Sequence, residues 1–250
     1  MARLDRREVH DECVADDAVE RNACCLLSIS VVVEGEVGMG SRVEQHFDAT
    51  RLPMAGRHNV LNALAAIAVA FELELDDTAV CRALAEFQGI DRRMQVIADE
   101  KTPVGQIMFI DDYGHHPTEI AATLEAVREG WPGRRRVVIF QPHRYSRTRD
   151  LLDDFAEVLS DAEPLFVTEV YAAGEDPIPG ADGRAICRAI RTRGRAEPVF
   201  VPDLSQLPKL LAGVLSDGDV VLTLGAGDIG SVATQLPEAM RGLDARRAAK

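Results

Sequence analysis

The stretch IMFIDDYGHHPTE, residues 107–119, passes from an apolar run into a polar cluster and then into the start of a helix. His116 stands at a capping position, Pro117 at the first helical position and Glu119 in the first turn, a combination typical of a helix N-terminus. In α/β folds, ligands bind at such junctions of strand, turn and helix. We therefore expect residues 107–119 to end a buried strand and to form a binding loop.

A second junction of the same kind, QPHRYSRT at residues 141–148, follows the apolar run 137–140. It contains three potential cations, His143, Arg144 and Arg147. Arginine guanidinium groups match the geometry of carboxylate and phosphate, so this loop predicts an anion site. The alternative is a solvated basic turn, which is common. Ser146 or Thr148 can cap the following helix and fix the loop, which favours the anion site.

From residue 107 onward, apolar runs alternate with amphipathic stretches, which indicates an α/β domain with a mostly parallel sheet. Five strands are predicted, at 107–110, 137–140, 165–170, 198–201 and 220–224. Helices are expected from Pro117 to about 130, then near 151–159, 186–190 and 207–214, and after 230. The GAGDIG sequence at 225–230 matches G-x-G-x-x-G, but it follows the last strand. A tight turn is therefore a better interpretation than a dinucleotide site.

The preceding part of the chain is organised differently. Residues 59–71 are Ala-rich and almost wholly apolar, which predicts a helix buried deep in a core. A second helix is expected at 77–87, and strands at 26–34 and 43–52 are weaker predictions. The pattern breaks at 88–93, so we expect one module at 1–91, a second at 92–240 and a solvated tail at 241–250.

Composition limits the function classes. The chain has 250 residues, 46% of them hydrophobic, and a formal net charge of -13, which argues against nucleic-acid binding. Five cysteines without metal-ligand spacing predict no metal site. We expect a cytoplasmic protein that does not enter a membrane, because no apolar run approaches a membrane span and the charged first residues do not resemble a signal peptide.

Several charged residues have competing interpretations. Asp111 and Asp112 end a strand, where one carboxylate could bind a ribose hydroxyl or both could cap the next helix. His115 and His116 could equally be capping or solvated residues. The run Arg134 to Arg136 precedes its strand and is expected to be a solvated group of charges at the amino edge of the sheet.

Taken in order, the strings GRHNVLNA at 56–63, FQGIDRR at 87–93, the two junctions and the GAGDIG turn resemble the Mur ligase family. The resemblance covers about residues 54–236. The DYGHHP and QPHRYSRT strings are most similar to the branch that joins L-alanine to UDP-N-acetylmuramate in peptidoglycan synthesis. A branch that attaches a whole peptide is less similar, because it lacks the QPHRY loop.

This resemblance implies a Rossmann-like C-terminal domain at 92–240, preceded by a partial central ATP-binding domain at 1–91. It implies ATP and Mg²⁺ as cofactors, with His58, Asn59 and Asn62 on the adenine side, Arg93 at the phosphates and Asp112 at the ribose. The implied pocket for L-alanine and the acyl-phosphate is lined by Tyr113, His115, His143, Arg144 and Arg147. Arg93, His143, Arg144 and Arg147 are the implied catalytic residues.

The chain also departs from the family. It has no UDP-sugar domain, no glycine-rich phosphate loop with its lysine, and none of the glutamate and histidine ligands that hold magnesium in the family. We therefore expect a truncated ligase that is inactive alone and lacks an N-terminal half. The alternative is a non-catalytic module that binds nucleotide and amino acid together with a separate N-terminal partner.

Overall fold

A computed structural model describes residues 3–4, 25–27, 33–34 and 50–247 of the chain. The chain divides into two compact units, residues 1–89 and 90–250, which are described separately. In the first unit, β1 (Arg3–Leu4) pairs with β3 (Val33–Glu34), and β2 (Cys25–Leu27) pairs with β4 (Thr50–Leu52), both antiparallel. Much of the strands expected at 26–34 and 43–52 lies outside the described residues.

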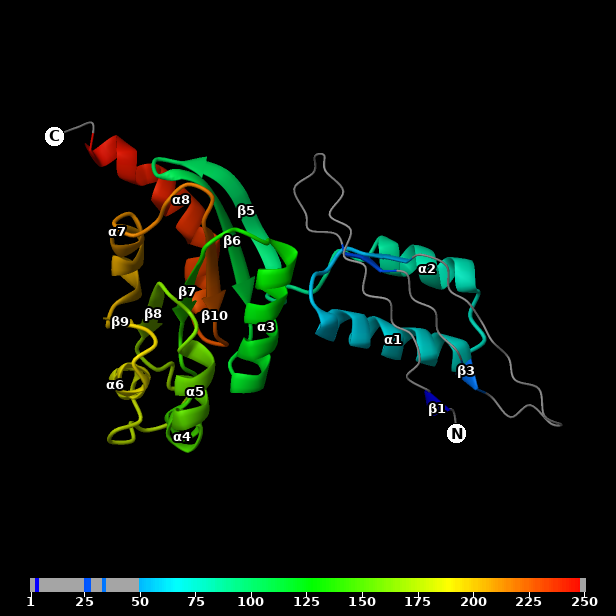
Figure 1. Ribbon diagram of the computed structural model, residues 1–250, viewed down its shortest axis with the longest axis horizontal. Helices are drawn as coiled ribbons and strands as arrows, with labels where there is room; N and C mark the ends of the chain where they lie inside the picture. Colours follow the sequence, from blue (N-terminus) through cyan, green and yellow to red (C-terminus); the bar gives the residue numbers. More distant parts are fainter. Residues whose placement is uncertain (1–2, 5–24, 28–32, 35–49, 248–250) are drawn as a thin grey trace. The chain divides into compact units, whose positions relative to one another are not determined.

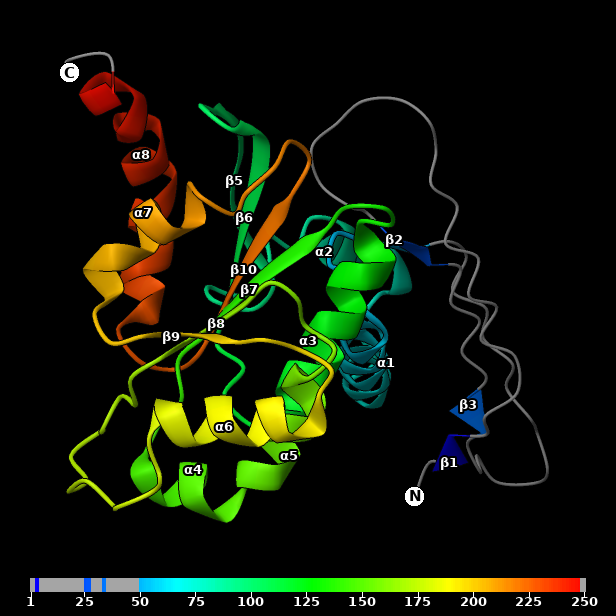
Figure 2. The same cartoon turned by 60° about the vertical axis from the view of Figure 1, so that its left-hand side comes forward.

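The second unit contains a six-stranded sheet in the order β5-β6-β10-β7-β8-β9 (Figure 2). Its strands are β5 (Gln95–Thr102), β6 (Gly105–Asp112), β7 (Arg136–Phe140), β8 (Leu165–Thr168), β9 (Val199–Val201) and β10 (Val220–Leu224). All neighbouring pairs are parallel except β5 with β6. The five predicted strands are thus present in a mostly parallel α/β sheet. β5 was missed, because this edge strand is only partly buried and a register shift between Val96 and Ala98 interrupts its alternation.

Helices lie on both sides of this sheet, with α7 and α8 on one side and α3 on the other (Figures 1 and 2). The helices of this unit are α3 (Pro117–Gly130), α4 (Tyr145–Asp150), α5 (Leu152–Leu159), α6 (Gly183–Arg193), α7 (Leu207–Leu211) and α8 (Ile229–Arg247). Residues 137–140 of β7 are fully buried, and each such apolar side chain contributes about 1.5–3 kcal/mol to folding. α8 continues to Arg247, so residues 241–247, expected in a tail, are helical.

The start of α3 forms as its sequence predicts. The Nδ1 of His116 accepts a hydrogen bond from the Thr118 amide at 3.3 Å, and Glu119 accepts from the amides of His115 and His116. These bonds satisfy amide groups that lack partners inside the helix. The capping box therefore fixes the path of the loop between β6 and α3.

The arginine run at 134–136 was predicted to be solvated, and it is solvated only in part: the side chain of Arg135 is 43% exposed, but that of Arg134 is only 21% exposed, and both have fixed partners. Arg135 donates to both carboxylate oxygens of buried Asp219, at 3.0 and 2.6 Å. Arg134 donates to the carbonyls of Gly218 and Asp219 and pairs with Asp99. A bidentate arginine satisfies a buried carboxylate. Arg134 and Arg135 therefore connect the start of β7 to residues 218–219, directly before β10, at the amino edge of the sheet.

In the first unit, α1 (Arg57–Glu72) and α2 (Asp77–Ala85) are the described helices. α1 buries Val60, Ala63 and Ile67 in a small core with Leu52. The expected deep burial on all sides is wrong, because Leu61, Val69 and Leu73 are 56%, 59% and 65% exposed. These three residues are spaced by eight and four positions, so they form one exposed apolar stripe along the helix.

Limited proteolysis should separate the two units. The expected first cut follows Phe87, because Phe87 and Ile90 are exposed side chains beside the boundary. Residues 92–240 should survive as a folded core, since their sheet and helices bury a continuous set of apolar side chains. The prediction is checked by mass spectrometry of the time course. Earlier cleavage within residues 137–159 would show that the boundary is misplaced.

Among the described residues, no helix is both long and apolar enough to span a membrane.

Candidate functional site

Three strand ends bring the predicted loops together at the carboxyl edge of the sheet. In the register of the parallel strands, Asp112 of β6 lies beside Leu224 of β10, which lies beside Phe140 of β7. The loop 113–116, the turn 225–228 and the loop 141–144 therefore leave the sheet side by side. The convergence predicted from the two junctions is confirmed.

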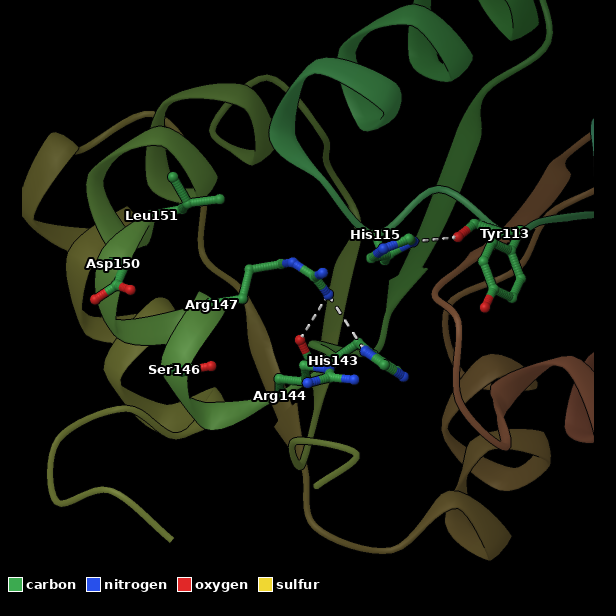
Figure 3. A pocket seen from close by; sticks show the side chains of 8 residues that line it. All are labelled: Tyr113, His115, His143, Arg144, Ser146, Arg147, Asp150 and Leu151. Atoms are coloured by element: carbon green, nitrogen blue, oxygen red, sulfur yellow. Dashed lines mark hydrogen bonds between the residues drawn. The ribbon is translucent and has the colours of Figure 1, made fainter. Parts of the chain in front are cut away.

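The loops 113–116 and 141–144, with residues of and after α4, line an open pocket of about 630 Å³ (Figure 3). It is lined by Tyr113, His115, His143, Arg144, Ser146, Arg147, Asp150 and Leu151. All five residues predicted to line the pocket are present in its lining: Tyr113, His115, His143, Arg144 and Arg147. Ser146 and Asp150 of α4, and Leu151 directly after it, also line the pocket but were not predicted as pocket residues, because the sequence does not show which way this short helix turns.

A row of four aromatic rings runs along the pocket edge. The ring of His143 lies 5.5 Å from that of His115 and is stacked at 5.5 Å on Tyr171, and Tyr113 meets His115 edge-on at 5.3 Å. Tyr171 was not assigned to the site from sequence. It reaches His143 through a parallel bridge between the two backbones, which only the folded order of strands reveals.

The glycine-rich turn packs against this edge and forms a tight turn. Gly225 has φ +144°, and a Cβ there would lie 2.7 Å from the carbonyl oxygen of Gln141. Gln141 is buried, and its Oε1 accepts a hydrogen bond from the Ile229 amide at the start of α8. The turn is therefore held to the QPHRYSRT loop, as expected for a structural role.

The imidazole of His143 is tuned toward its neutral form. Partial burial is the largest cause that lowers the pKa of His143 below its ordinary value, and the charges of His115, Arg147 and Arg144 lower it further. The carboxylate of Glu175 opposes this shift. The Nη1 of Arg147 lies 3.3 Å from the Nδ1 of His143 and donates to its carbonyl oxygen at 3.1 Å. Because guanidinium can only donate, the Nδ1 is the acceptor. A neutral His143 therefore carries its proton on Nε2, from which it can donate a hydrogen bond to a bound substrate.

Arg144 has a strained backbone with φ +73° and ψ 134°. Its amide donates to the Tyr171 carbonyl at 2.9 Å, and its own carbonyl accepts from the amide and hydroxyl of Thr148. These bonds hold a conformation that costs a residue with a side chain about 1–3 kcal/mol. Strain of this kind persists where the surrounding structure over-determines it, which fits a side chain held at a binding pocket.

This strain predicts different effects for two substitutions that both remove the guanidinium. Arg144→Gly should have a free energy of unfolding about 1 kcal/mol higher than Arg144→Ala, because strain relief of ~1–3 kcal/mol exceeds the ~0.4–1 kcal/mol entropic cost of glycine. Urea unfolding of both variants measures the difference. An Arg144→Ala variant as stable as Arg144→Gly would show that the backbone relaxes here without cost.

Asp111 and Asp112 are buried and support the loops from inside. Asp112 is 3% exposed and accepts from the amides of Met94 and Gly114 and from the hydroxyl of Thr123. Asp111 accepts from Arg92 and Thr223. Neither caps α3, so that alternative is wrong. Both carboxylate oxygens of Asp112 accept hydrogen bonds within the protein. The ribose contact expected for Asp112 is therefore not part of the proposed function.

The other predicted residues lie outside the pocket lining. The guanidinium of Arg93 lies 5.5 Å from the ring centre of Tyr113 and 3.5 Å from the carboxylate of Glu119, so it is adjacent to the pocket and still 45% exposed. His58, Asn59 and Asn62 belong to α1 of the first unit. Asn59 is buried and donates to the Ala55 carbonyl at 2.7 Å, whereas Asn62 is exposed.

The second unit is thus an α/β domain with a pocket lined by histidine and arginine side chains at the carboxyl edge of a mostly parallel sheet. The model of the family described as "Mur ligase, glutamate ligase domain" matches residues 92–227. The chain belongs to the Mur ligase family, whose members are ATP-dependent ligases that form amide bonds.

Solved structures agree with this assignment. UDP-N-acetylmuramate-alanine ligase from Thermotoga maritima is 33% identical, with a TM-score of 0.64 over 88% of this chain and 43% of that protein. A murein peptide ligase from Psychrobacter arcticus is 22% identical, with a TM-score of 0.58 over 90% of this chain and 43% of that one. Folylpolyglutamate synthase from Mycobacterium tuberculosis is 16% identical, with a TM-score of 0.54 over 85% of this chain and 47% of that one. The last two show a shared fold alone. The chain thus spans less than half the length of each of these proteins.

Proposed function

We propose that this chain is the amino-acid-accepting part of an ATP-dependent ligase that joins L-alanine to UDP-N-acetylmuramate. The observation that carries this proposal is the pocket in which Arg144 and Arg147 face His143 and His115. Two guanidinium groups suit a carboxylate or a phosphate, and the pocket is open enough for a small substrate. The 33% identity to the Thermotoga maritima enzyme supports alanine as that substrate.

In this proposal each pocket residue has a chemical task. Arg144 and Arg147 bind the alanine carboxylate and stabilise charge on the acyl-phosphate as the amine attacks it. His143, neutral with its Nδ1 facing Arg147, donates a hydrogen bond from Nε2 to the bound substrate, and the alanine reacts as its free amine. Tyr113 and His115 form the opposite wall and orient the substrate.

ATP supplies the phosphoryl group that activates the sugar-lactyl carboxylate. Of the residues that the family resemblance assigns to ATP, Arg93 of the second unit would contact the phosphates. The partly exposed guanidinium of Arg93, close to Tyr113, suits such a contact. Asn59 is buried and bonded to Ala55, which fits it better for fixing the start of α1. The resemblance implies magnesium as well, and no described residue of this chain is proposed to bind it.

A second candidate, a non-catalytic module that acts with a separate N-terminal partner, rests on α1. Leu61, Val69 and Leu73 form an exposed apolar stripe, and such surfaces commonly mark a protein contact. The same stripe also suits a ligase whose N-terminal half is a separate chain. The two candidates differ in whether the assembled protein turns over substrate.

A chimera distinguishes them. The part of the Thermotoga maritima ligase that this chain does not match is joined to the 250-residue chain, and mass spectrometry follows formation of the amide between L-alanine and UDP-N-acetylmuramate. The proposed function requires a product that depends on L-alanine and ATP. A chimera that folds and binds ATP but forms no amide would support the non-catalytic module.

A further inference from the structure

Glu175 connects the pocket to a loop that the proposed mechanism does not use. It lies between β8 and α6, and its backbone follows Ala173 and Gly174, which have φ +51° and +85°. Its Oε2 accepts from the Ser146 amide at 2.9 Å, and its Oε1 accepts from the Ser146 hydroxyl at 2.6 Å. A residue 29 positions away in sequence thus holds the first turn of α4.

The same carboxylate also pairs with Arg144. The Nη1 of Arg144 lies 3.7 Å from the Oε1 of Glu175, whose side chain is 24% exposed. The hydrogen bonds from Ser146, opposed by burial and aided by Arg144, lower the pKa of Glu175 below its ordinary value. Glu175 is therefore ionised at neutral pH, and one anion is shared between a helix start and a pocket cation.

Without this anchor, the start of α4 has few other fixed contacts. The Arg144 amide is bonded to Tyr171, and Thr148 is bonded back to Arg144. Neither bond involves Ser146, whose amide and hydroxyl both donate to Glu175. Arg147 stands on the first turn of α4 and reaches His143 only if α4 starts in the observed direction.

We propose that Glu175 is a positioning residue of the ligase, which fixes Arg144 and the first turn of α4 so that Arg144 and Arg147 together face His143. The inference rests on the proposed function for what the pocket binds, but the placement of the side chains can be tested without it. Glu175 would contact neither alanine nor the phosphoryl group. Its contribution is the arrangement of the two cations that do.

The test uses the 250-residue chain with three variants. Glu175→Ala removes the anchor, Glu175→Gln keeps an acceptor but removes the charge, and Glu157→Gln is the matched control. Glu157 also pairs with two arginines, Arg193 and Arg195, but it lies outside the pocket lining. Amide hydrogen exchange, NMR titration of the His143 ring and NMR titration with L-alanine are measured for each.

Glu175→Ala should speed exchange of the Ser146 and Thr148 amides at least about tenfold, because their local opening no longer breaks an anchor. Both Glu175 variants should lower the pKa of His143 further. The groups facing that ring are His115, Arg144, Arg147, Tyr171 and Glu175, and Glu175 is the only anion among these five. L-alanine should bind at least about fivefold more weakly to both variants, and Glu157→Gln should change none of these values.

Unchanged exchange and an unchanged His143 titration would overturn the inference. So would wild-type binding of L-alanine by Glu175→Ala, if Arg144→Ala weakens that binding in the same assay. If wild-type protein and Arg144→Ala both fail to respond to L-alanine, the proposed function fails instead, and hydrogen exchange with the His143 titration still decides the role of Glu175.

Discussion

The Arg147→Ala form of the chimera is expected to lose at least about tenfold in kcat/KM for L-alanine, or ~1.4 kcal/mol of transition-state stabilisation. Arg147 lines the pocket and reaches His143, so its loss removes a cation where carboxylate and acyl-phosphate charge would lie. Arg144→Ala should lose a similar factor. Since both residues lie on an exposed loop and helix start, the melting temperature should stay nearly constant for Arg147→Ala.

Arg149 provides the matched control on the same helix. It is an exposed α4 arginine, paired with Asp150, and does not line the pocket. Arg149→Ala should therefore keep kcat/KM within about twofold, because surface changes away from the reacting groups alter ΔG by less than ~0.5 kcal/mol. Full activity of Arg147→Ala, or an equal loss in Arg149→Ala, would place the substrate in another loop.

The second large effect concerns the chain by itself. Given ATP, UDP-N-acetylmuramate and L-alanine, the 250-residue chain should release no more phosphate than a sample without protein. The sequence contains no glycine-rich loop with a lysine to hold the phosphates, and cationic side chains at the acceptor pocket do not replace it. A phosphate-release assay checks this, with the chimera as the positive control. Turnover by the chain alone would mean that residues 1–91 carry an ATP site of a different kind.

The parts of the fold that could be predicted were those with strong local signals. β7 and β10 were predicted as short runs that are apolar apart from Arg136 and Thr223, because they are buried on both faces of a parallel sheet. The start of α3 was recognisable because a cap, a proline and an acidic residue occupy fixed positions. The pocket followed from topology, since polar residues after adjacent parallel strands must meet at one edge.

The parts that were missed depend on contacts between distant segments. β5 is an edge strand with charged residues, so its pairing with β6 leaves only a weak pattern. Arg134 and Arg135 looked solvated because Asp219, their buried partner, lies more than eighty positions away in sequence. The role of Glu175 could not be predicted either, because its partner Ser146 lies 29 positions away in sequence. The burial of Asp112 was also invisible, because the Met94 amide and the Thr123 hydroxyl reach it only in the folded state.

In the proposed function, the pocket between the two histidine loops binds the incoming amino acid. The most direct measurement is an NMR titration of the chain with L-alanine to about 50 mM, a range that covers a Kd near 1 mM, or ~4 kcal/mol of binding. We expect the ring signals of His115 and His143 to shift along one saturation curve, and we expect the Arg144→Ala, Arg147→Ala double variant to abolish both shifts. Ring signals that stay unchanged in the wild-type chain, or that shift equally in the double variant, would contradict the account.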